Sequence, residues 1–379
     1  MEWCSKFLAR CVAASLICLS GCAGQADHSA SSHSTQVTVG GPLLVPGDSI
    51  RLEETDDRFI GRVSGMAVAP DGSMLVADGM QGRVARFARD GRFIQMYGRS
   101  GRGPGEFVAP TGIAFSGDTL IGIVDSREGR VSFLNYPEGE FIKSVQVDEV
   151  VSGRIALYKD RIWLGAQSAF THTGMLVVDP TSGESRVFLN YPASIAESRV
   201  LSTRYGNATF HIGSRDSIFA ILRGASSTLY LIDEQLEVAS ARAIPERRRW
   251  GAPPDLGPRM DAARSQQEEF RLTSSPFGVH QLANGHIAVI HFDQTLRLDP
   301  VHITNEGWLS VLDLSNGVAC VDGSIPLSPD NFATVKFAGD TLYTVEQAVL
   351  TNGRAETFAR MYSIDLSSCE WLPIQERQL

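Results

Sequence analysis

The chain has 379 residues, of which 43% are hydrophobic and 20% charged, and its formal net charge is -9. This composition predicts a folded globular protein and excludes disorder throughout the chain. Nucleic acid is not an expected partner, because acidic side chains outnumber the Lys and Arg that would neutralise phosphates. After the first twenty residues, no apolar run is long enough to predict a membrane-spanning helix.

The first 22 residues have the layout of a secretion signal, in which a weakly basic start is followed by the short apolar stretch Cys11–Ser20. The stretch leads into Leu-Ser-Gly-Cys22, which resembles the bacterial lipobox. That resemblance implies that Cys22 is lipidated and that the secreted protein is anchored in the bacterial cell envelope. Ala23, in place of Asp, favours the outer membrane. The alternative is an ordinary signal peptide with a chance cysteine.

Residues 23–41 are rich in Ser, His, Thr and Gly and lack apolar periodicity, so we expect a flexible tether between the lipid and the folded domain. A single domain then follows over residues 42–379, and internal repeats organise it. Residues 65–78 and 112–125 share one pattern, in which a short apolar strand, a turn containing Asp and a second apolar strand follow one another. The turn recurs in weaker form four more times, at residues 159–160, 215–216, 284–285 and 339–340.

Repeats of about 40 to 50 residues that contain short strands are typical of β-propellers. Six such units predict an all-β, six-bladed β-propeller with four-stranded blades. A β-helix is the rival fold, but its coils are shorter than this repeat. The segment RSGRGPGEF at 99–107, followed by PTGIA at 110–114, resembles the link between blades in NHL-repeat proteins and in bacterial six-bladed β-propeller families. The resemblance implies the fold and leaves the function open, because this scaffold carries lyases, lactonases, sensors and protein-binding modules.

Two segments lie outside the predicted blades. We expect Asp48–Glu54 to form a strand that pairs with the last blade and closes the ring, which removes an exposed sheet edge. Residues 244–275 form an insertion between blades four and five, and Arg259–Phe270 within it suits a short helix. The insertion also carries three arginines, 247–249, before Trp250, a pattern typical either of a solvated face or of a protein interface.

Beyond Cys22 the chain keeps two cysteines, Cys320 and Cys369, in a compartment that favours disulfides. We place both on the outermost strands of neighbouring blades, where the backbones diverge. A disulfide requires closely spaced Cα atoms, so this placement favours two free thiols over a bond, although pairing stays open.

The ends of the second strands predict a first group of candidate ligand-binding residues. All six are polar although the strands before them are apolar: Asp78, Asp125, Gln167, Arg223, His291 and Gln347. We expect them at the mouth of the central funnel, on the face that also carries the long loops between blades. The alternative is that they cap backbone amides of the loops, a role that suits Asp.

The first strand of each unit predicts the residues nearest the propeller axis. These are Ala67, Ala114, Ala156, Ile212 (or His211 with a one-residue bulge), His280 and Lys336. The first three are small and the last three are basic, titratable or adjacent to such a residue. This asymmetry predicts a channel wall that prefers a small anion such as a carboxylate or phosphate. The alternative is a water-filled channel, or histidines packed neutral between blades.

Catalysis is the weaker of two functional hypotheses. His211, His280 and His291 lie on separate strands and can hold Zn with an open position if they converge, as channel histidines do in propeller lyases that process amidated peptides. No Gly-x-Ser-x-Gly motif accompanies them. We therefore expect a lipid-anchored propeller that binds an anionic ligand or a protein partner without catalysis and without a cofactor. A lyase or hydrolase assisted by Zn or Ca is the alternative.

Overall fold

The computed structural model describes residues 40–147, 149, 151–166, 172–191, 208–222, 227–245, 269–298, 301–327, 334–349 and 355–377. The chain divides into two units, residues 1–35 and 36–379, and every described residue belongs to the second. Apart from one 3-10 turn, η1 (Ser214–Asp216), all regular elements in these residues are strands. No helix of the described part has the length and hydrophobicity needed to cross a membrane.

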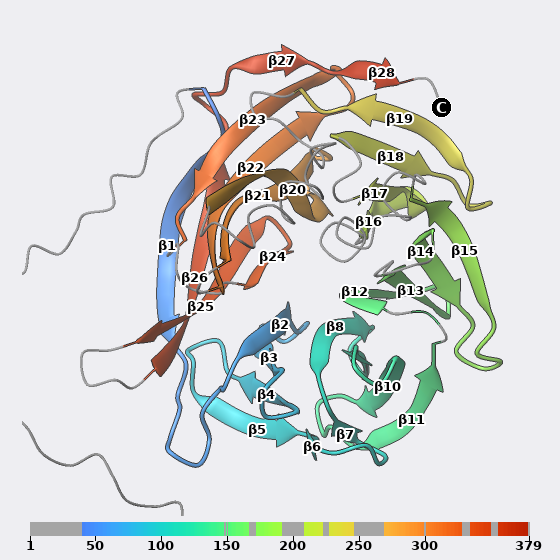
Figure 1. Cartoon of the computed structure of the whole chain (residues 1–379), viewed down its shortest axis with the longest axis vertical. Helices are drawn as coiled ribbons and strands as arrows, with labels where there is room; N and C mark the ends of the chain where they lie inside the picture. The colour runs from blue at the N-terminus through green and yellow to red at the C-terminus, as the bar shows by residue number, and fades with distance from the viewer. Residues whose placement is uncertain are drawn as a thin grey trace, which may run out of the picture. The chain divides into compact units, whose positions relative to one another are not determined.

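The first three large sheets are four-stranded and antiparallel, and each follows the chain outward from an inner strand (Figure 1). Their strands are β2 (Val63–Val68), β3 (Met74–Asp78), β4 (Arg83–Phe87) and β5 (Phe93–Tyr97); β8 (Pro110–Ser116), β9 (Leu120–Asp125), β10 (Arg130–Asn135) and β11 (Phe141–Gln146); and β12 (Val151–Tyr158), β13 (Arg161–Ala166), β14 (Thr173–Val178) and β15 (Ser185–Asn190). A short parallel pair lies between the first two sheets along the chain, β6 (Arg99–Ser100) with β7 (Glu106–Phe107).

Each of the other three sheets takes one strand from elsewhere in the chain. Their own strands are β16 (Ala208–Ile212), β17 (Ile218–Leu222), β18 (Thr228–Ile232) and β19 (Val238–Ala243); β20 (Glu269–Gln281), β21 (Ile287–Leu298), β22 (Val301–Asp313) and β23 (Val318–Ile325); and β24 (Thr334–Ala338), β25 (Thr341–Val349) and β26 (Ala355–Asp365). The added strands are β28 (Gln375–Arg377) beside β19, β27 (Trp371–Pro373) beside β23, and β1 (Leu43–Arg51) beside β26.

The six sheets form a closed ring. Their inner strands contact one another in the order β2, β8, β12, β16, β20 and β24, and β24 contacts β2 again (Figure 1). Buried hydrophobic side chains form six clusters, and each cluster lies between two adjacent sheets. Both faces of every sheet therefore contribute to the core, which explains why the strands are apolar on both faces. The expected six-bladed β-propeller is confirmed, with blades of four or five strands.

The N-terminal strand closes the ring as the sequence predicts. β1 pairs antiparallel with β26, with Leu43 opposite Asp365 and Arg51 opposite Phe358. The next residue, Leu52, is fully buried, and its N–H donates to the carbonyl oxygen of Thr357 at 2.9 Å. The observed strand begins five residues before the expected one and ends three residues before it. The last blade is thus built from both ends of the propeller.

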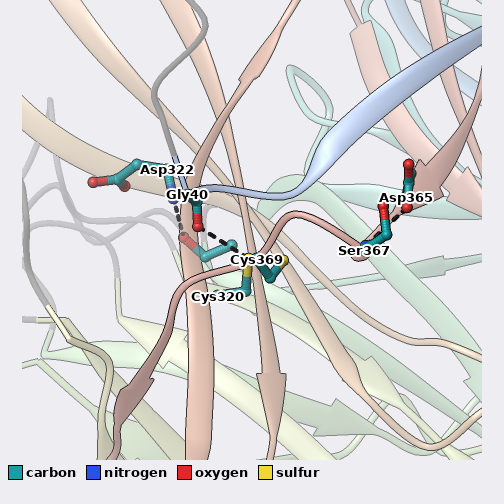
Figure 2. The surroundings of a disulfide bond; sticks show 7 residues. Gly40, Cys320, Asp322, Asp365, Ser367 and Cys369 are labelled. Carbon is teal, nitrogen blue, oxygen red and sulfur yellow. Dashed lines mark hydrogen bonds between the residues drawn. A yellow bond between two sulfur atoms is a disulfide. The ribbon is translucent and has the colours of Figure 1, made fainter.

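The two cysteines pair, contrary to the preferred expectation. Cys320 in β23 and Cys369 form a disulfide with a Cα–Cα distance of 5.6 Å. Cys369 does not occupy an outer strand of blade six, because β1 takes that position; the chain after β26 instead returns to blade five, where Trp371 in β27 pairs with Cys320. The carbonyl oxygen of Gly40 lies beside the disulfide and accepts the N–H of Glu370 at 2.8 Å (Figure 2). Around the disulfide, the start of the propeller at Gly40 is therefore hydrogen-bonded to the C-terminal segment that follows β26.

The expected helical insertion between blades four and five is not supported. Glu269 and Phe270, the last residues of the expected helix, belong to β20, and residues 246–268 lie outside the described part of the chain. The same blade has longer strands than the repeat predicts, because residues 291–307 extend the β21–β22 hairpin and are paired as far as Leu298 and Val301. His291 therefore lies in the middle of the sheet and not at the end of a strand.

Deletion of residues 42–56 tests the closing strand. We expect the free energy of unfolding to fall by at least about 2 kcal/mol, the scale for burying one leucine, because Leu52 and the whole β1–β26 pairing are removed. Deletion of residues 23–39 is the control and is expected to leave the thermal midpoint unchanged. Equal midpoints for the two deletions, measured by circular dichroism, would contradict a stabilising role for β1.

Candidate functional site

The inner strands surround a cavity of about 720 Å³. All the residues that the repeat spacing places nearest the axis line it: Ala67, Ala114, Ala156, His211, Ile212, His280 and Lys336. The expected inner ring, taken residue by residue, is therefore present in the structure. The cavity reaches Pro70 and Gly339 in the turns between first and second strands, so it lies toward the end opposite the links between blades. This differs from the expected loop-rich face, much of which falls outside the described residues.

The inner strands of blades one to three pack against one another backbone to backbone. A Cβ atom on Gly65 would lie 2.2 Å from the carbonyl oxygen of Thr111, and one on Gly112 would lie 2.4 Å from that of Gly153. Only glycine fits at such distances. The charged and histidine side chains of the cavity wall, Arg154, His211, His280 and Lys336, come from blades three to six.

Lys336 extends from β24 to the inner strands of the next two blades around the ring. Its Nζ donates hydrogen bonds to the carbonyl oxygens of Met66 at 3.2 Å and Ile113 at 3.3 Å, which belong to blades one and two. Burial, together with the positive charge of Arg154, lowers the pKa of Lys336 to about 8. At neutral pH the side chain is thus mainly protonated, and it loses its charge at a lower pH than an ordinary lysine.

Arg154 in β12 is the second cation of the cavity, and the sequence analysis missed it. Its guanidinium lies 4.2 Å from the centre of the Phe277 ring and donates to the carbonyl oxygen of Phe277. Arg154 also lines a second cavity of about 220 Å³ at the link end of the inner strands, so it stands between the two cavities. Strand alternation predicts this position, because Arg154 is two residues before Ala156 and its side chain points to the same face of the strand.

The two channel histidines are neutral, which corrects the idea that His280 supplies positive charge. His280 and His211 lie with ring centres 4.3 Å apart, and His280 donates from Nε2 to the carbonyl oxygen of Gly339 at 2.9 Å. Burial lowers the pKa of His211 to about 3, and the charges of His280 and Lys336 act in the same direction. Burial also lowers the pKa of His280. Both rings therefore provide hydrogen-bonding groups without charge at pH 7.

The charge balance of the cavity wall is one-sided. Among the described residues that line it, Arg154 and Lys336 carry positive charge, and none is Asp or Glu. The described residues that line the smaller cavity at the link end include Arg154 and no Asp or Glu. Because partial burial weakens screening by water, two cations that line one cavity favour an anion there.

His291 lies away from this cavity. It is fully buried in blade five, where its Nδ1 is 2.6 Å from the Ser274 hydroxyl and its Nε2 is 3.1 Å from the Ser310 hydroxyl and 3.4 Å from Asp322. It is therefore part of a polar network inside the sheet and does not converge with His211 and His280. In the described part of the chain, no group of three or more His, Cys, Asp or Glu is placed to hold a metal ion.

The polar residues expected at the funnel mouth hold the links between blades. The buried carboxylate of Asp78 accepts four backbone N–H groups, including those of Gly61 and Arg62, and that of Asp125 accepts two, both at 2.9 Å. Gln347 acts similarly, because its side chain donates to the carbonyl oxygen of Ile60 at 2.7 Å. The capping role is thus the observed one. Gln167 and Arg223 lie outside the described residues.

Substitution of Asp78 by Ala distinguishes a cap from a ligand-binding group. We expect a loss of about 2 kcal/mol or more in unfolding free energy, because buried backbone N–H groups lose their acceptor, and no loss of anion affinity in the folded protein. Asp57→Ala, at an exposed position, is the control and is expected to be neutral. A variant with unchanged stability but weakened anion binding would contradict the capping role.

The comparisons with known proteins agree with the fold. A family model described as a 6-bladed beta-propeller matches residues 48–209, which span blades one to three and enter β16. A member of the duf4221 family from Bacteroides vulgatus has a similar structure, with a TM-score of 0.59 and 12% identity over 89% of this chain and 99% of that chain. A Bacteroides fragilis protein follows with a TM-score of 0.54 and 12% identity, over 84% and 95% of the two chains.

A third similar structure is a protein of unknown function from Bacteroides thetaiotaomicron, with a TM-score of 0.50, 11% identity and coverage of 84% of this chain and 72% of that chain. No curated protein matches the sequence significantly. At identities this low the structural similarity shows the fold alone. The class of protein is therefore a six-bladed β-propeller, and its function has to be argued from the cavity.

Proposed function

We propose that the protein is a binding protein, anchored to the bacterial envelope through a lipid on Cys22, that holds a small anionic ligand in the central cavity of its propeller. One observation carries the ligand class: Arg154 and Lys336 line a cavity of about 720 Å³ whose described lining contains no Asp or Glu. A volume of this order suits a small molecule rather than a protein segment with its own fold.

The two cations have complementary geometries for such a ligand. The guanidinium of Arg154 is planar and offers paired N–H donors to a carboxylate or phosphate, whereas the ammonium of Lys336 is a compact point charge. The neutral rings of His211 and His280 and the apolar residues of the inner strands form the rest of the wall. A small carboxylate with a short apolar body fits this combination of groups.

Anion binding is tested with lactate, citrate and inorganic phosphate by isothermal titration calorimetry. We expect at least one of these probes to bind, with an affinity that falls as salt concentration rises, and to lose about tenfold or more in affinity in Lys336→Met and Arg154→Met. Because Lys336 is charged below a pKa of about 8, affinity is expected to fall as pH rises through that value.

Lys143→Met is the matched control, because Lys143 lies on outer strand β11, its ammonium donates to the carbonyl oxygen of Pro180, and neither residue lines the cavity. We expect it to bind the probes like the native protein. Folding of each variant is checked by circular dichroism. Equal affinities in the native protein and in both cavity variants would contradict the proposed site.

The proposed location rests on two features. The Leu-Ser-Gly-Cys22 sequence follows a short apolar stretch, as in bacterial lipoproteins. The Cys320–Cys369 disulfide supports an extracytoplasmic compartment, because disulfides persist mainly where the surroundings are oxidising.

Substitution Cys22→Ser tests the anchor. We expect the variant to remain an unlipidated precursor that leaves the membrane fraction, because the thiol that receives the lipid is absent. Metabolic labelling with a radioactive fatty acid and fractionation measure the two effects. Cys320→Ser serves as the control for loss of an unrelated cysteine and is expected to keep the label. Continued fatty-acid incorporation into Cys22→Ser would show that the anchor lies elsewhere.

A further inference from the structure

Lysine is a rare residue in this protein. The sequence contains 4 Lys and 30 Arg, and beyond residue 22 the lysines are Lys143, Lys159 and Lys336. Lys143 and Lys159 lie near the surface, where Lys159 pairs with Asp216. The third lysine is the one in the central cavity. A chain that uses arginine for nearly all its positive charge thus places an amine at the propeller axis.

The surroundings of that amine suit a reactive group. In the described part of the chain, Nζ of Lys336 donates to two backbone carbonyl oxygens, those of Met66 and Ile113. Most of the surrounding wall is apolar, with Ala67 and Ala114 facing the axis. Arg154 lines the same cavity and acts electrostatically on Lys336. Desolvation and a neighbouring cation are the two conditions that make a lysine amine nucleophilic.

We propose that Lys336 captures small carboxylates that carry a ketone or aldehyde, the class of oxo acids, as a reversible imine, while Arg154 holds the carboxylate. This inference rests on the proposed anion site and names its ligand class. Arginine at position 336 would supply the charge equally well but has no nucleophilic amine at neutral pH.

The chemistry balances without a further reactant. The neutral amine of Lys336 attacks the carbonyl carbon, so a C–N bond forms as the carbonyl π electrons move to oxygen. Two protons pass from nitrogen to that oxygen, and water leaves as the C=N bond forms. The imine nitrogen can then take up a proton, and addition of water reverses every step. No oxidant or reductant takes part, so the ligand is held and released unchanged.

The protonation state of Lys336 sets the expected pH profile. Its pKa is lowered to about 8 by burial and by Arg154, so a larger fraction of neutral amine is present near neutral pH than in an ordinary lysine. Imine formation at Lys336 is therefore expected to rise with pH and to level off near pH 8. An ordinary exposed lysine continues to gain reactivity well above that pH.

Reductive trapping with pyruvate and sodium cyanoborohydride tests the proposal on the intact protein. Peptide mapping by mass spectrometry is expected to find the reduced adduct on Lys336 at about tenfold or more the level on Lys143 and Lys159 near neutral pH, the minimum that its lowered pKa implies. Excess lactate, which has the carboxylate but no carbonyl, is expected to suppress trapping by competing for Arg154.

Two variants complete the test. Lys336→Arg keeps a cation but is expected to lose the adduct, and Lys143→Arg is expected to keep the native yield on Lys336. If Lys336→Arg does not fold, the site mapping and pH profile of the native protein decide alone. Lactate binding without an adduct on Lys336 would overturn the imine and leave the anion site standing. Absence of the adduct together with absence of binding by lactate, citrate and phosphate would overturn the proposed function as well.

Discussion

The whole architecture depends on the fact that each sheet is apolar on both faces. A sheet of this kind is stable only if another sheet covers each face, and the six hydrophobic clusters between neighbouring blades meet that requirement all round the ring. The requirement also explains β1, because a ring with an incomplete last blade would leave the edge of β26 open. Closure therefore determines where the inner strands lie and which side chains reach the axis.

The repeat made the residues nearest the axis predictable, because a position counted from the turn lies at the same distance from the axis in every blade. Ala67, His280 and Lys336 lie on the cavity wall for that reason. The same argument failed for His291, since the strands of blade five are longer than the repeat and enclose it. Arg154 was missed because only one position per strand was considered, although alternation places every second residue on the same face.

The pairing of Cys320 with Cys369 was beyond the reach of repeat spacing. Spacing assigns a residue to a blade in chain order, whereas the segment after β26 leaves its own blade and joins two earlier ones as β27 and β28. The charge states of His211 and His280 could not be predicted from the sequence for a related reason. A pattern gives the identity of a residue and its depth, but the pKa depends on burial and on charges that other blades bring near.

The proposed anion site depends on the closure of the ring. Lys336 belongs to the last blade, which β1 completes, yet its ammonium is held by carbonyl oxygens of blades one and two. Arg154 likewise reaches from blade three to Phe277 in blade five. Both cations therefore take their positions only when the six blades are assembled. A ligand held by them binds the closed ring and not an opened one, so its binding free energy adds to the stability of closure.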